Sequence, residues 1–244
     1  MAGLYPLPLH LKLVFLYNSV ATTLWFCCLV RFLILLPLVG TKFLPGGIAD
    51  FFHVVALIPL IGFFVERINR YRTLRLKDSW ILANGLRMVW ICYGVIFPYP
   101  IIAKHPSYSL LITSWCLSCL IHYSYHAFRI KTRGSPYFLF WLQYNNHYLT
   151  FPLGLIAEMI LVFLSLKFVL EDLIYEYILK TALLAYIPLA YFTWGYLQQR
   201  KQTRFVDIMQ KRNAIKRAQD GQVSVTVSSV TESSQEHELR AINS

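Results

Sequence analysis

Charged side chains are rare in this chain. Asp, Glu, Lys and Arg together make up 14% of the 244 residues, whereas 57% are hydrophobic and 16% aromatic. A single soluble domain of this length carries far more charge, so the composition excludes that class and indicates a membrane protein. Acidic residues are the scarcer sign, with 12 against 23 basic ones. The basic residues gather in short connections between apolar runs, which argues against nucleic-acid binding.

Cysteine is also used in a way that excludes several functions. All five cysteines lie within apolar stretches, where a thiol behaves as a small hydrophobic group: Cys27, Cys28, Cys92, Cys116 and Cys119. Their spacing matches neither a disulfide framework nor a zinc site. None has an arginine six positions later, so a cysteine-dependent phosphatase is excluded as well.

The N-terminus lacks the short apolar core and small-residue cleavage site of a removable signal peptide. We expect its first apolar run to remain as a membrane helix, because that run exceeds the ~20 residues that a bilayer requires. Hydropathy predicts six transmembrane helices, at about residues 13–38, 48–65, 80–103, 108–128, 136–168 and 181–197. The fold class is therefore an all-α integral membrane protein.

The connections between these spans predict the orientation. Residues 66–77 carry five basic side chains, and residues 129–133 and the tail from Arg200 are also basic, whereas residues 171–176 are acidic. By the positive-inside rule the basic segments are cytosolic, and both termini then lie in the cytosol.

The tail is predicted to differ from the membrane domain, which we assign to residues 1–199. Residues 200–244 begin basic and become rich in Ser and Thr from Gly221, with too little apolar periodicity to pack, so we expect the tail to be largely disordered. Its first part fits either a helix on an anionic membrane surface or a solvated linker.

The fifth span contains the strongest candidate for a functional site. The stretch 143–158 holds several polar groups inside an apolar run, where such groups are costly unless they have partners or a use. At about 100° per residue, four of its side chains share one helical face, with a glycine at the edge of that face. These residues are Tyr144, His147, Phe151, Glu158 and Gly154. We expect Pro152 to kink this face.

Short motifs in the same order along all six spans resemble a known family over about the first 205 residues. These are Leu16-Tyr17-Asn18, Glu66, Arg87, Trp115 with Tyr123, Tyr144-Asn145, Pro152, Gly154, Glu158, Ala185-Tyr186-Ile187-Pro188 and Gln199-Arg200-Lys201. The chain thereby resembles the very-long-chain (3R)-3-hydroxyacyl-CoA dehydratases, also called protein-tyrosine-phosphatase-like proteins. The resemblance implies a lyase of the fatty-acid elongation cycle in the endoplasmic reticulum membrane, without a cofactor or a metal.

The family's fifth span carries a catalytic Tyr-Pro-x-Gly-x-x-x-Glu pattern. Here the glutamate is kept as Glu158, and the tyrosine is replaced by Phe151. Gln143 stands where the family usually has an arginine, and Cys119 and His122 stand where glutamate and arginine are common.

The resemblance implies the roles of the site residues. Eliminating water from a 3-hydroxyacyl thioester requires a base for the α-proton and an acid for the departing hydroxide. Glu158 is the candidate base, and His147 is either a substitute acid or a partner in hydrogen bonds between helices. The substrate pocket is assigned to Tyr144, Tyr148, Gly154, Tyr123 and Arg87. His122 and His126 have metal-ligand spacing, but the sequence offers no further ligand.

Three hypotheses follow. The first is a dehydratase that acts on very-long-chain 3-hydroxyacyl-CoA beside the elongase and reductase components of the elongation system and in contact with membrane lipid. The alternative, supported by the missing phenol, is a catalytically impaired scaffold or acyl-CoA-binding partner of that system. A transporter is disfavoured because the sequence shows no inverted repeat.

Overall fold

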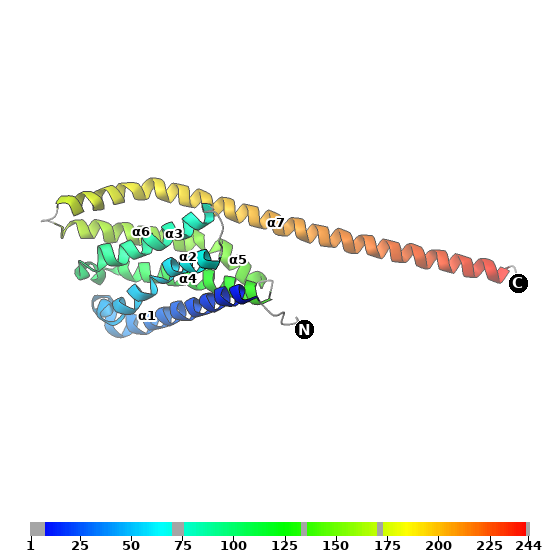
Figure 1. The fold of residues 1–244 in the computed structure, drawn as a ribbon, viewed down its shortest axis with the longest axis horizontal. Coiled ribbons are helices and arrows are strands. Elements are labelled where there is room, and N and C mark those ends of the chain that lie inside the picture. Colours follow the sequence, from blue (N-terminus) through cyan, green and yellow to red (C-terminus); the bar gives the residue numbers. More distant parts are fainter. Residues whose placement is uncertain (1–7, 70–75, 133–135, 170–172, 243–244) are drawn as a thin grey trace. The chain divides into compact units, whose positions relative to one another are not determined.

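Every element of the fold is helical in the computed structural model, which describes the backbone of residues 8–69, 76–132, 136–169 and 173–242. Side chains are described for residues 8–65, 81–132, 136–169 and 173–210. The elements, traced in Figure 1, are α1 (Leu9–Val55), α2 (Ile58–Asn69), α3 (Leu76–Val89), η1 (Trp90–Ile96), η2 (Pro100–Lys104), α4 (Pro106–Thr132), α5 (Tyr137–Asn145), α6 (His147–Leu166) and α7 (Leu173–Ile242). The predicted all-α class is confirmed.

Helix α1 is a hairpin of two antiparallel arms. Its backbone turns at Gly40, whose φ of 69° lies in the left-handed region that favours glycine. A Cβ on Gly47 would lie 3.0 Å from Leu35 Cδ1, and the Arg31 guanidinium lies 5.9 Å from the ring centre of Phe51, so the two arms pack along their length. The arms coincide with the first predicted span and the start of the second, which α2 continues.

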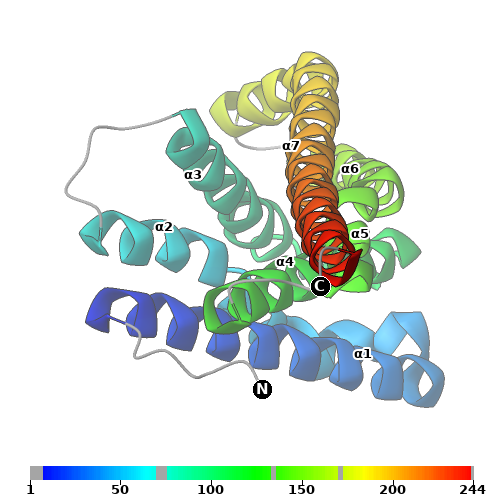
Figure 2. The same ribbon diagram turned by 90° about the vertical axis from the view of Figure 1, so that its right-hand side faces the viewer.

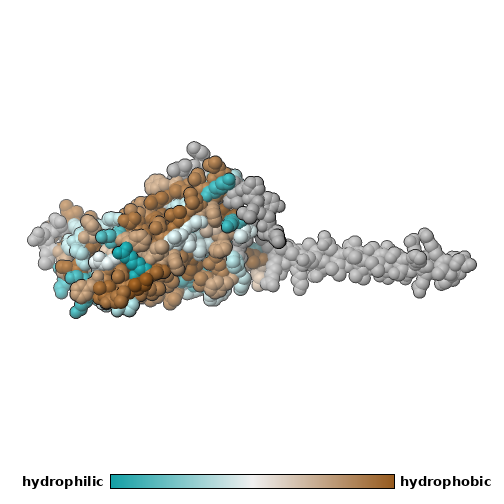
Figure 3. All heavy atoms as spheres, turned by 90° about the horizontal axis from the view of Figure 1, so that it is seen from below, coloured by the Kyte–Doolittle hydropathy of each residue, from teal (hydrophilic) through white to brown (hydrophobic). Residues whose placement is uncertain are grey.

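The chain is a membrane protein. Three of the described stretches are long and apolar enough to cross a bilayer, namely Leu9–Val65, Tyr137–Leu166 and Leu173–Gln210, and Ile81–Ile96 is a shorter apolar helical stretch. Large apolar side chains such as Leu38 and Phe163 are exposed, and apolar side chains cover most of the face of the bundle seen in Figure 3. Lipid is the environment in which such a surface is stable. The six crossings and the cytosolic termini stay predictions.

The core lies along α4, which packs against α1 on one side and α6 on the other (Figure 2). Phe52 lies at its centre, in edge contact with Trp25 and Tyr108 at ring-centroid distances of 6.4 and 5.9 Å. In lipid, helices associate through close packing and polar contacts rather than through burial of apolar area. Small residues serve this purpose at Gly85, where a Cβ would lie 3.0 Å from the backbone of Leu60.

Two of the six predicted spans, the third and the fifth, are not single straight helices. The third span consists of α3 followed by a π-helix, η1, and the 3₁₀ helix η2. In the fifth span, α5 ends at Asn145 and α6 begins at His147, while Pro152 lies inside α6. The predicted break therefore falls in the turns that precede Pro152, on the side where a proline ring crowds the preceding carbonyls.

The chain divides into two compact units, Met1–Ala190 and Tyr191–Ser244. The backbone of the tail is helical as far as Ile242, where the sequence predicts disorder from Gly221. That prediction rests on the missing apolar face, which does not prevent an existing helix from extending by one hydrogen bond per residue. The boundary at residue 199 stays a prediction. Glu176, expected in a connection, lies within α7 and pairs with Lys180 at 2.5 Å.

Part of the charge pattern that predicts the orientation lies outside the described residues. This applies to 70–75, 133–135 and 170–172, and therefore to most of the basic connection after α2 and to the acidic residues at 171 and 172.

Candidate active site

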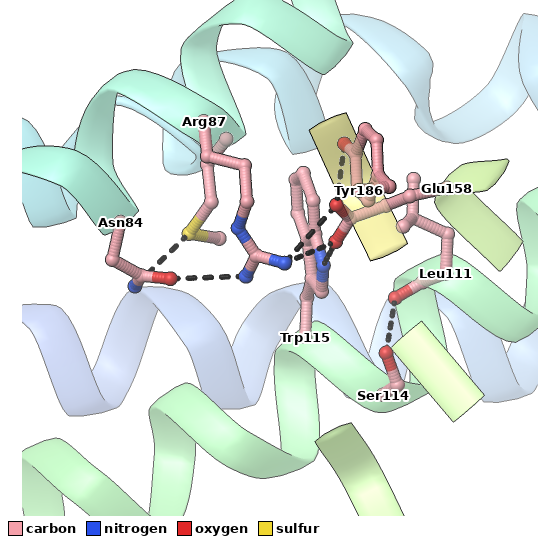
Figure 4. Close-up of polar contacts among 8 residues, drawn as sticks. Asn84, Arg87, Leu111, Ser114, Trp115, Glu158 and Tyr186 are labelled. Carbon is pink, nitrogen blue, oxygen red and sulfur yellow. Dashed lines mark hydrogen bonds and ion pairs between the residues drawn. The ribbon is translucent and has the colours of Figure 1, made fainter. Parts of the chain in front are cut away.

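Glu158 is the centre of a polar network inside the bundle. It projects from α6 and its exposed fraction is 0%. The Arg87 Nη1 atom of α3 lies 2.9 Å from Glu158 Oε1 and 3.0 Å from Oε2. The Trp115 indole of α4 donates to Oε1 at 3.0 Å, and the Tyr186 hydroxyl of α7 donates to Oε2 at 2.9 Å. Four helices thus contribute one side chain each to the site (Figure 4).

Arg87 is itself held in place. Its Nη2 atom donates to Asn84 Oδ1 at 2.9 Å, from one turn earlier on α3 (Figure 4). The Arg87 side chain is 24% exposed, so the network has one edge that is open to the surroundings while Glu158 is closed off. The π-helix η1 begins at Trp90, directly after this turn of α3. Such segments often occur at functional sites, because the wider turn shifts the direction of the side chains that follow.

The bonding accounts for a charged carboxylate in this position. An isolated charge in a low-dielectric interior is costly by several kcal/mol, and only an opposite charge with further hydrogen bonds offsets that cost. Each oxygen of Glu158 accepts from Arg87 and from one further donor, Trp115 or Tyr186. A carboxylate oxygen has about two lone-pair sites, so both oxygens are fully used. Glu158 is therefore held in one orientation, and these donors stabilise its ionised form.

Gly154 and Phe52 position the indole that reaches Glu158. A Cβ on Gly154 would lie 2.7 Å from Ser114 Oγ and 3.7 Å from Trp115 Cδ1, so a larger residue here would have to displace the Ser114 side chain. The Trp115 ring is stacked on Phe52, with centroids 5.7 Å apart and an angle of 29° between the planes. Trp115 therefore has little rotational freedom, and its N–H stays directed at the carboxylate.

The predicted site residues fall into separate groups. Arg87, Glu158 and Gly154 lie together around the network. Tyr123 and Tyr144 are also buried, but they belong to aromatic contacts elsewhere. Tyr123 of α4 packs edge-on against Tyr17 with ring centroids 5.8 Å apart, and Tyr144 of α5 packs against Phe140 with centroids 4.9 Å apart. At about 1.5 Å per residue, Tyr123 lies about 12 Å along α4 from Trp115. The pocket role of these two tyrosines stays a prediction.

The remaining predicted residues lie toward the start of α6. His147 is half-buried and stacks on Tyr148, with ring centroids 4.3 Å apart, and Tyr148 is 42% exposed. Phe151 is half-buried on the same helix. Positions 151 and 147 precede Glu158 by about 10 and about 16 Å along the helix axis at the usual rise. Their assignment as the position of the family tyrosine and as a substitute acid stays a prediction.

Three members of the network were not among the predicted site residues: Asn84, Trp115 and Tyr186. Trp115 and Tyr186 did belong to the motifs that carry the family resemblance, which was the available signal. Asn84 precedes Arg87 by one helical turn, where a side chain can reach its neighbour. In the predicted His122–His126 pair, His122 Nδ1 lies 3.2 Å from Gln143 Nε2. The described residues contain no group of three side chains that could together hold a metal ion.

Comparison with known proteins bears on this network directly. Residues 85–205 match the model of the protein tyrosine phosphatase-like protein family, PTPLA. The chain belongs to this PTPLA family. The matched region contains Arg87, Trp115, Glu158 and Tyr186, and so the whole set of side chains that bond the carboxylate.

Several curated relatives are similar over different lengths. A probable very-long-chain (3R)-3-hydroxyacyl-CoA dehydratase of Schizosaccharomyces pombe is 34% identical over 85 residues, which are 34% of this chain and 39% of that protein. The dehydratase PASTICCINO 2 of Arabidopsis thaliana is 25% identical over 88 residues, 36% of this chain and 40% of that protein. The chain thus spans about two fifths of the length of these dehydratases.

A further relative is similar over most of its length. The β-1,6-glucan synthesis-associated protein KEG1 of Saccharomyces cerevisiae is 29% identical over 188 residues, which are 72% of this chain and 90% of that protein. No solved structure matches the chain.

Proposed function

We propose that this PTPLA-family chain is a lyase that dehydrates very-long-chain 3-hydroxyacyl-CoA to trans-2-enoyl-CoA in the fatty-acid elongation cycle. The observation that carries the proposal is the buried Glu158, bonded by Arg87, Trp115 and Tyr186. All four lie in the region that matches the family, and several relatives of the chain are named as dehydratases of such thioesters.

The geometry supports Glu158 as the base for the α-proton. Arg87 bonds both carboxylate oxygens, and the Trp115 indole is the further donor to Oε1. The other oxygen, Oε2, is shared between Arg87 and the neutral hydroxyl of Tyr186. Of the two neutral donors, Trp115 is held by its stack on Phe52, so Tyr186 is the donor that the substrate would displace. The α-carbon of the thioester would approach Oε2 by replacing the Tyr186 bond.

The surroundings of the site support a substrate with a long acyl chain. Apolar helices border the network, and a role in fatty-acid elongation would put the protein in the endoplasmic reticulum membrane beside elongase and reductase components. The partly exposed side of Arg87 is then the side from which the polar thioester would enter. His147, Tyr148, Phe151, Tyr144 and Tyr123 are proposed as the outer part of this path.

The test is a turnover assay on the purified protein in detergent. With a 3-hydroxyacyl-CoA, formation of the conjugated 2-enoyl thioester is expected and can be followed by its absorbance. Glu158→Gln should abolish turnover, and Glu176→Gln, which alters a partly exposed carboxylate paired with Lys180, should leave it unchanged. A folded protein that forms no enoyl product across acyl chain lengths would contradict the proposed function.

A second function is favoured by two observations. Phe151 stands where the family has its catalytic tyrosine, and the similarity to KEG1 covers 72% of this chain, more than the similarity to either dehydratase described above. On this reading the Glu158 network only holds four helices together, and the protein supports β-1,6-glucan synthesis without turning over a thioester. The alternative that the sequence suggests, a scaffold or acyl-CoA-binding partner of the elongation system, is a different role without chemistry and stays a prediction.

The two functions separate in cells. In Saccharomyces cerevisiae depleted of KEG1, expression of this chain should restore β-1,6-glucan if the second function holds, and a Glu158→Gln variant present at equal abundance should restore it equally. Restoration that depends on Glu158 at equal abundance would contradict a role without chemistry.

A further inference from the structure

The network contains a phenol that the proposed reaction can use. Phe151 has no hydroxyl, so the acid that protonates the departing hydroxide must come from elsewhere. Tyr186 is 5% exposed, and its hydroxyl lies 2.9 Å from Glu158 Oε2, inside the closed site. It comes from α7 and therefore approaches the carboxylate from a different helix than position 151 does.

The position of Tyr186 fits the geometry of the elimination. The base removes a proton from the α-carbon and the acid protonates the oxygen on the adjacent β-carbon, and each group must come within about 2.6–3.2 Å of its atom. The base and the acid must therefore lie near each other. Position 151 offers no proton because it is a phenylalanine, and His147 begins about 16 Å along α6 from Glu158. Tyr186 already lies at hydrogen-bond distance from the base.

We propose that Tyr186 is the general acid of the dehydration, paired with Glu158 as the base. This inference rests on the proposed function. The substrate lies between the Tyr186 hydroxyl and Glu158 Oε2 and takes the place of their mutual hydrogen bond. Glu158 removes the α-proton, and the electron pair of the C–H bond becomes the α,β double bond. The β-carbon–oxygen bond breaks, and the leaving oxygen takes the phenolic proton and departs as water.

The same pair returns to its starting state without an outside proton donor. After the reaction Glu158 carries the α-proton and Tyr186 is a tyrosinate. Once the product leaves, the direct contact between the two oxygens is restored, and the proton passes from the carboxylic acid to the tyrosinate. Arg87 stabilises the pair throughout, because its single positive charge balances the single negative charge that moves between Glu158 and Tyr186.

The test compares two substrates that differ only in their leaving group. A 3-hydroxyacyl-CoA needs an acid, whereas the matching 3-chloroacyl-CoA releases chloride without one. Tyr186→Phe should lower kcat on the hydroxy substrate about 10²–10⁴-fold, the usual contribution of general acid catalysis. It should change the enzyme-catalysed rate on the chloro substrate by less than about 3-fold. Glu158→Gln should abolish turnover of both, since both lose the same α-proton.

Controls separate chemistry from packing. Tyr175→Phe removes another phenol of α7, which donates to the Gly94 carbonyl, and should leave both rates unchanged. Equal losses on both substrates in Tyr186→Phe would show a structural role and overturn the proposal for Tyr186 while the lyase activity stands. A native protein that turns over neither substrate would overturn the proposed function, and the role of Tyr186 with it.

Discussion

Removal of Arg87 should destabilise the protein sharply, because it leaves a buried carboxylate without its counter-charge. In Arg87→Met, the methionine fills much of the same volume, but Glu158 keeps only the indole of Trp115 and the hydroxyl of Tyr186 as donors. Breaking one side of a buried ion pair costs about 3–5 kcal/mol. Arg87 is 24% exposed, so the pair is not completely enclosed, and the expected loss is at the lower end, about 3 kcal/mol. That is more than a 100-fold change in the ratio of folded to unfolded protein.

The double variant Arg87→Met, Glu158→Leu tests the reason for this loss. Replacing a buried ion pair by apolar side chains is often neutral, because the desolvation cost of both charges disappears with them. The double variant should therefore recover most of the stability that Arg87→Met loses, although Trp115 and Tyr186 then lack their acceptor. The measurement is reversible unfolding in mixed detergent micelles, followed by tryptophan fluorescence.

Lys180→Gln is the matched control, because it breaks the partly exposed Glu176–Lys180 pair on α7. Its unfolding should be indistinguishable from that of the native protein, since exposed pairs contribute little. The reasoning would be refuted if Arg87→Met were as stable as this control. It would also be refuted if the double variant lost as much stability as Arg87→Met and Glu158→Leu lose together when each is made alone, since the two charges would then be independent.

Three further predictions concern packing, orientation and the tail. Gly154→Ala should destabilise the bundle by about 1–3 kcal/mol in the same unfolding assay, since the new methyl group meets Ser114 Oγ at 2.7 Å. Adding Ser114→Gly should recover much of this loss. If Gly154→Ala unfolds like the native protein, α4 and α6 are less closely packed than the structure shows. In sealed microsomes, tags at residue 1, near Arg72 and at residue 244 should be accessible from the cytosol and a tag near Lys104 protected, and protection near Arg72 would overturn the six-span orientation. Deletion of residues 221–244 should leave membrane insertion and activity unchanged, and a large loss of folded protein would show that the tail docks.

The helical class and the membrane environment follow from the sequence alone because both are local properties. Apolar runs of bilayer length predict helices whatever they pack against, and the described apolar runs are helical, although their helices differ in bounds from the predicted spans. The break between the two arms of α1 falls at Gly40, between the first and second predicted spans. Glu158 could be singled out for the same kind of reason, since a carboxylate in an apolar run needs partners.

Which partners Glu158 has was decided by the tertiary structure. Arg87, Trp115 and Tyr186 are separated from it by 71, 43 and 28 residues, and helical periodicity gives the face of each helix but not the neighbour or the depth at which it packs. The sequence therefore predicts one face of the fifth span as the site, from Tyr144 to Glu158. In the fold, the donors come instead from three other helices, because only packing brings side chains so far apart in the chain within hydrogen-bond distance of one buried charge.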